Sequence, residues 1–103
     1  MGHIRSTDTT EEILREVGSR LRGFRLRQNR TQADLAEAAG VGHATVKRAE
    51  AGESIRLETI VKILRALGRV EALDSFLPEP LVSPIQLVEQ RERGRQRARR
   101  SRG

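Results

Sequence analysis

The sequence predicts an all-α fold: a compact bundle of about five helices with a helix-turn-helix, then a short C-terminal helix and a disordered basic tail. Apolar residues recur at helical spacing through most of residues 10–77. Capping residues and glycines stand where these segments should begin and end. No segment has a convincing strand pattern. We therefore expect helices packed on helices.

The first predicted helix covers about residues 10–28. Asp8 or Thr9 can cap it, because a Glu follows three residues later in either frame. Gly18 and Gly23 each cost about 1 kcal/mol relative to Ala inside a helix, so they weaken this segment. We expect this helix to end at Asn29.

The next two helices form the helix-turn-helix. Thr31 caps the first of them with Asp34 three residues later, and Gly40 ends it. Gly42 occupies the cap position of the second, which ends at Gly52. Two helices of about eight residues around a glycine turn place the second helix in the DNA major groove.

Two further helices complete the predicted bundle. Leu57 to Leu67 carry an amphipathic pattern that Gly68 ends, and Val70 to Leu77 suggest a short fifth helix. Prolines then interrupt the chain, and Ser83-Pro84 can start one more short helix, over residues 84–92. We expect the chain to have four parts: a disordered N-terminus (1–9), a DNA-binding domain (10–77), a Pro-flanked extension for a dimer or partner contact (78–92) and a disordered Arg-rich tail (93–103).

The charge of the chain is unevenly placed. The net charge is +6, and residues 91–103 alone carry it, with seven Arg and one Glu; residues 1–90 hold 13 basic and 13 acidic residues. Within that neutral body, residues 20–30 contain five Arg and no acid, directly before the helix-turn-helix. This block suggests contacts to phosphates, with a solvated helix face as the simpler alternative.

Several classes of protein are excluded by composition. Without Cys there are no disulfides or thiolate metal sites, and the two His are isolated from carboxylates, so we expect no metal site, no cofactor and no enzyme. No apolar run approaches the ~18 residues of a membrane helix, and a signal peptide pattern is missing. We therefore expect a cytoplasmic protein that makes no membrane contact and is nucleoid-associated when bound to DNA.

With these residues identified, the chain resembles the lambda-repressor-like, Xre-type family over about residues 17–68. The matching residues are Leu21, Arg25, Thr31, Gln32, Leu35, Ala36, Gly40, Val41, Val46, Glu50, Gly52 and the helix from Leu57 to Gly68. Three features depart from the family pattern: Gly42 replaces a capping Ser or Thr, Arg30 replaces an apolar residue, and the connector 53–56 has no Pro.

The resemblance implies a role for each matching position. Arg25 and Glu50 would form a structural ion pair, although Arg25 could instead bind phosphate. Base reading is expected from His43, Ala44 and Arg48. Phosphate contact or positioning on DNA is expected from Thr31, Gln32, Gly42, Thr45, Lys47, Arg27 and Arg30.

The resulting hypothesis is a sequence-specific regulator of transcription that binds double-stranded DNA. It would be a homodimeric (auto)repressor on a palindromic operator. The connector 53–56 and the helix that follows it, which begins Leu57-Glu-Thr-Ile, are similar to the subgroup encoded beside HipA-type kinases. The segment Phe76 to Pro84 and the Arg-rich tail strengthen this resemblance, which implies an antitoxin with a kinase toxin as partner. Two alternatives stay open: a stand-alone repressor without a toxin, and a protein-interaction module with only non-specific DNA binding.

Overall fold

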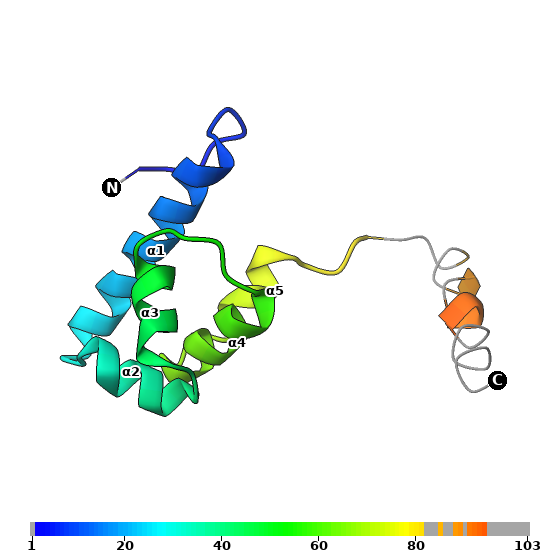
Figure 1. Cartoon of the computed structure of the whole chain (residues 1–103). Coiled ribbons are helices and arrows are strands. Elements are labelled where there is room, and N and C mark those ends of the chain that lie inside the picture. The colour runs from blue at the N-terminus through cyan, green and yellow to red at the C-terminus, as the bar shows by residue number, and fades with distance from the viewer. Residues whose placement is uncertain (1, 82–84, 86–87, 90, 95–103) are drawn as a thin grey trace. The chain divides into compact units, whose positions relative to one another are not determined.

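The protein is built from helices. The computed structural model describes residues 2–81, 85, 88–89 and 91–94. The labelled helices are α1 (Thr10–Arg27), α2 (Gln32–Ala39), α3 (His43–Glu50), α4 (Leu57–Ala66) and α5 (Ala72–Phe76) (Figure 1). No strand occurs among the described residues, and none of their helices is both long and apolar enough to cross a membrane. The predicted all-α class is therefore confirmed.

The chain divides into two compact units, Met1–Ala72 and Leu73–Gly103. The first unit thus ends five residues before the predicted domain limit at 77. In the second unit, residues 85, 88–89 and 91–94 are helical, inside and just beyond the helix expected over 84–92. The rest of the predicted Arg-rich tail, residues 95–103, lies outside the described residues.

The N-terminal segment, for which we expected disorder, folds back along α1 and forms no helix of its own. The backbone N–H of Gly2 donates to Glu16 Oε1 at 3.1 Å, and Arg20 Nη2 donates to the Gly2 carbonyl at 3.1 Å. The Glu16 pKa is lowered, chiefly by its hydrogen bond from Arg20 and then by that from Gly2. Thr9, and not Asp8, caps α1 in a capping box with Glu12.

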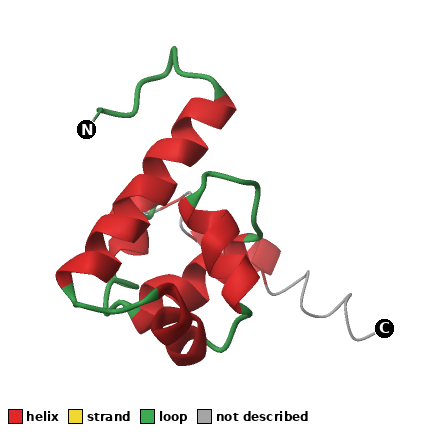
Figure 2. Cartoon of the chain, turned by 60° about the vertical axis from the view of Figure 1, so that its left-hand side comes forward, coloured by secondary structure: helices red, strands yellow, loops and turns green. Residues whose placement is uncertain are grey.

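One hydrophobic core unites the first unit. In Figures 1 and 2, α3 lies beside α1, and it packs against both α1 and α2, while α2 also packs against α4. The buried apolar residues are Leu21, Leu35, Ala36, Val46, Ala49, Ile63 and Leu67. Burial of a Leu, Ile or Val side chain contributes about 1.5–3 kcal/mol each, so the core draws its stability from all four helices.

Each of the first four helices ends in the same way. Asn29, Gly40, Gly52 and Gly68 have positive φ angles between 55° and 83°. After α2, for example, Val41 N–H donates to the Ala36 carbonyl at 3.0 Å and Gly40 N–H donates to Glu37 at 3.2 Å. These two bonds form a Schellman motif, which satisfies carbonyls at the helix end. Glycine and asparagine therefore end these helices as predicted, because the position after each helix requires a positive φ angle.

Gly18 allows α1 and α3 to approach closely. A Cβ atom at Gly18 would lie 2.5 Å from the Ala49 carbonyl oxygen and 2.7 Å from that of Glu50. Gly23, on the same helix, would place a Cβ atom with no atom within 4 Å. The two glycines have the same helix propensity, but only Gly18 is required for packing.

These two positions predict opposite effects of the same substitution. Gly18→Ala should destabilise the fold by about 1–3 kcal/mol, because α3 backbone must move away from α1. Gly23→Ala should stabilise it by about 0.5–1 kcal/mol through helix propensity alone. Urea denaturation followed by circular dichroism measures both free energies of unfolding. Equal stabilisation by the two substitutions would contradict the close contact.

Candidate nucleic-acid interface

Helix α3 separates a buried side from an exposed one. Val46 and Ala49 are in the core, whereas His43, Ala44, Lys47 and Arg48 are exposed, and Thr45 is half-buried. The helical period places residues 44, 47 and 48 together on the side opposite the core. The structure therefore leaves a short row of small and cationic side chains free to contact another molecule.

The start of α3 is uncapped by any side chain. Gly42 is its N-cap residue with φ −71° and ψ 151°, and it makes no side-chain hydrogen bond to the helix. The carbonyl of Gly42 still accepts from Thr45 and Val46. The N–H groups of His43 and Ala44, at the first two positions of α3, have no carbonyl within the helix to bind, so they remain available to an anion such as phosphate.

The start of α2 is held by its own side chains. Thr31 Oγ1 accepts the Asp34 N–H at 3.0 Å, and Asp34 Oδ2 accepts the Thr31 N–H at 2.9 Å. The bond from the Thr31 backbone is the main reason why the pKa of Asp34 is lowered. Gln32, the first residue of α2, is half-buried and lies next to the end of α3. The capping box thus fixes the backbone from which Gln32 projects.

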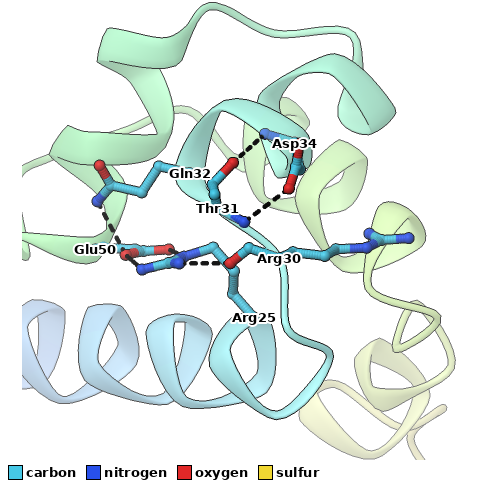
Figure 3. Close-up of polar contacts among 6 residues, drawn as sticks. All are labelled: Arg25, Arg30, Thr31, Gln32, Asp34 and Glu50. Atoms are coloured by element: carbon cyan, nitrogen blue, oxygen red, sulfur yellow. Dashed lines mark hydrogen bonds and ion pairs between the residues drawn. The ribbon is translucent and has the colours of Figure 1, made fainter.

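Glu50, the last residue of α3, joins three helices in what we call the Glu50 cluster: Arg25, Gln32 and Glu50 (Figure 3). Arg25 Nε donates to Glu50 Oε2 at 2.7 Å and Arg25 Nη2 donates to Glu50 Oε1 at 3.0 Å. Gln32 Nε2 donates to the same Oε1 at 3.1 Å. The cluster ties α1 and the first residue of α2 to the end of α3.

The ion pair in this cluster is buried. The side chain of Arg25 is 8% exposed and that of Glu50 is 4% exposed. The remaining Nη1 of Arg25 donates to the Arg30 carbonyl at 2.7 Å. The bidentate bond to Glu50 raises the pKa of Arg25 against the opposing effect of burial. Among the described residues no buried side-chain polar atom lacks a partner, so both charges are fully compensated.

The side chain of Arg30 points away from the Glu50 cluster (Figure 3). Its Nη1 donates to the Ala66 carbonyl at 2.7 Å, and Gln28 Nε2 donates to the Leu67 carbonyl at 2.9 Å. Both carbonyls lie at the end of α4, where no N–H group of the same helix can donate to them. Arg30 therefore has a partner inside the protein, whereas Arg27 is exposed.

An open hollow lies beside α3, between its outer side and the start of α4; we call it the α3–α4 hollow. Its volume is about 690 Å³, and it is lined by Thr45, Arg48, Glu53, Ser54, Ile55, Arg56 and Thr59. Two arginines and three hydroxyl groups here can donate to an anion. The predicted site did not include Ser54, Arg56 and Thr59. These Arg and hydroxyl residues lie just before α4 and in its first turn, and their grouping there was the sequence feature that could have indicated them.

The comparison with protein families agrees with this geometry. A family model described as Helix-turn-helix matches residues 21–73. The matched range contains α2, α3, α4, the Glu50 cluster and the α3–α4 hollow. In the comparison with curated proteins, none matched the chain.

The Glu50 cluster predicts strong coupling between two substitutions. Glu50→Leu alone should destabilise the protein by about 3–5 kcal/mol, because Arg25 is left buried without its counter-charge. The double variant Arg25→Met/Glu50→Leu should recover most of this loss, since no uncompensated charge remains. Thermal and urea unfolding of the single and double variants measure the coupling energy. A double variant that is as unstable as the sum of the two single ones would refute a compensated pair.

Proposed function

The chain belongs to the helix-turn-helix family of DNA-binding transcription regulators, in its lambda-repressor-like, Xre-type form, and we propose that it is a sequence-specific, dimeric (auto)repressor. The observation that carries this proposal is the exposed side of α3. It presents Arg48 next to the α3–α4 hollow, while the opposite side of the helix is anchored in the core. A helix held in this way can enter the major groove as a rigid body.

Base reading falls to three side chains of α3 in this proposal. Arg48 can donate two hydrogen bonds to O6 and N7 of guanine. Ala44 can contact a thymine methyl group, and His43 can donate or accept at a base edge. All three residues are exposed, and none is used in the core.

Phosphate contacts would fix the position of α3 on the duplex. We assign this role to Thr31, Gln32, Gly42, Thr45, Lys47 and Arg27, and we add Ser54, Arg56 and Thr59 from the α3–α4 hollow. Arg30 also belongs to this group, through the guanidinium nitrogens other than Nη1, which binds the Ala66 carbonyl at the end of α4. We assign to Arg30 the further role of joining the α1–α2 corner to α4.

The second unit is our candidate for the dimer contact. Phe76, Leu77, Leu81, Ile85 and Val88 are all more than half exposed. Large apolar side chains gathered in one short segment are typical of interaction surfaces. A second copy that covers them would give a two-fold dimer, which reads two half-sites about one helical turn apart.

A finer proposal makes the protein the antitoxin of a HipA-type kinase. Its support is the likeness of the connector 53–56 and of the segment from Phe76 to Pro84 to that subgroup. Under this proposal the protein acts in the cytoplasm, associated with the nucleoid. Copurification with a kinase encoded next to it would support the antitoxin role, and its absence would favour the stand-alone repressor.

Arg48→Ala tests the central assignment. On the DNA immediately upstream of its own gene, we expect this substitution to weaken binding by about 10- to 100-fold, which corresponds to one lost bidentate base contact. Arg65→Ala, an exposed arginine in the last turn of α4, is the matched control and should change binding little. Fluorescence anisotropy with excess competitor DNA measures both.

The competitor decides between the proposal and its alternative. If competitor DNA removes the wild-type protein and Arg48→Ala has no effect, the chain is an interaction module with non-specific DNA binding.

Substitution in the second unit tests the dimer contact. Leu81→Glu combined with Ile85→Glu should convert a dimer to a monomer without unfolding the first unit, because both side chains are exposed. Leu26→Glu, at an apolar residue of α1 that is 51% exposed, serves as the control and should stay dimeric. Sedimentation equilibrium measures the mass. A double variant that remains dimeric would place the contact elsewhere.

A further inference from the structure

We propose that Glu53 limits sequence-independent binding of DNA by lowering the attraction of the α3–α4 hollow for phosphate. This inference rests on the proposed DNA-binding function and adds to it a residue that opposes binding. Glu53 contributes the only carboxylate to the lining of the hollow, beside Arg48 and Arg56. A negative charge at this place lowers the affinity of the hollow for phosphate. The effect on binding to DNA of random sequence is therefore what the experiment below measures.

The backbone fixes Glu53 in this position. Gly52 has φ +83°, and the following N–H of Glu53 donates to the Arg48 carbonyl at 3.0 Å. This bond belongs to the Schellman motif that ends α3. The backbone of Glu53 is therefore held against that of Arg48, at the C-terminal end of α3. The connector 53–56 then continues to Arg56 and the start of α4.

The carboxylate of Glu53 has no structural partner among the described residues. Every ion pair found there joins other residues: Glu16 with Arg20, Arg25 with Glu50, Glu58 with Lys62 and Glu89 with Arg93. The Glu53 side chain is exposed, and the hydrogen bonds to carboxylates in that part of the chain are accepted by Asp8, Glu12, Glu16, Asp34 and Glu50. Its charge is thus not needed for folding, in contrast to the buried charge of Glu50.

Electrostatics gives the direction of the effect. Arg48 and Arg56 attract any phosphate, and attraction of this kind supplies essentially all non-specific binding. One negative charge among two positive ones halves the net charge of the hollow. On an operator, Arg48 would gain hydrogen bonds to a base as well, so it depends less on this net charge. Weaker non-specific binding leaves fewer competing sites occupied along a genome.

The test compares three proteins on one short duplex of random sequence. Glu53→Gln should bind this duplex about fivefold more tightly than wild type, the effect of one charge about 4 Å from another in water. Glu71→Gln is the matched control, because it removes the same charge beyond the opposite end of α4. The gain of Glu53→Gln should fade as salt is raised, since exposed charges are screened.

The outcomes separate the two proposals. If wild type binds the duplex and Glu53→Gln binds no more tightly than Glu71→Gln, the role of Glu53 is overturned and DNA binding stands. A gain that persists at high salt would overturn it as well, because the effect would not be Coulombic. If neither wild type nor Glu53→Gln binds duplex DNA, both proposals fail.

Discussion

The buried ion pair of Arg25 and Glu50 is the contact on which the position of α3 depends, because among the described residues neither side chain forms an ion pair with any other residue. Glu50 is the last residue of α3 and Arg25 lies in the last turns of α1. A buried pair adds little stability compared with apolar residues of the same size, but it is costly to break. It therefore acts as a constraint: α3 can occupy only the position in which both oxygens of Glu50 are satisfied.

The same set of bonds extends to other helices. Arg25 also holds the Arg30 carbonyl, and the Arg30 side chain reaches the end of α4. Gly18 removes the side chain that would hold α1 and α3 apart. One side of α3 is thus fixed by packing and polar contacts, while the exposed residues on its outer side take no part in these contacts. This separation lets the outer side be specialised for a ligand without loss of the fold.

Local features of the sequence predicted most of the fold, whereas contacts between distant residues were harder to foresee. Thr31, Gly40, Gly52 and Gly68 mark helix ends through bonds within a few residues, so a sequence pattern reveals them. The partner of Arg30 lies 36 residues away, and an arginine in a basic block looks the same whether it binds a carbonyl or a phosphate. The α3–α4 hollow likewise exists only after α4 is placed against the helix-turn-helix. The fifth helix is shorter than the predicted span from Val70 to Leu77.

Methylation interference on the DNA upstream of the gene tests the central claim, that the outer side of α3 reads bases in the major groove. A methyl group on guanine N7 blocks the atom that Arg48 would contact. We expect two groups of guanines whose methylation prevents binding, about one helical turn apart, as two copies of α3 would require. Binding that no methylated guanine disturbs would contradict major-groove reading by α3.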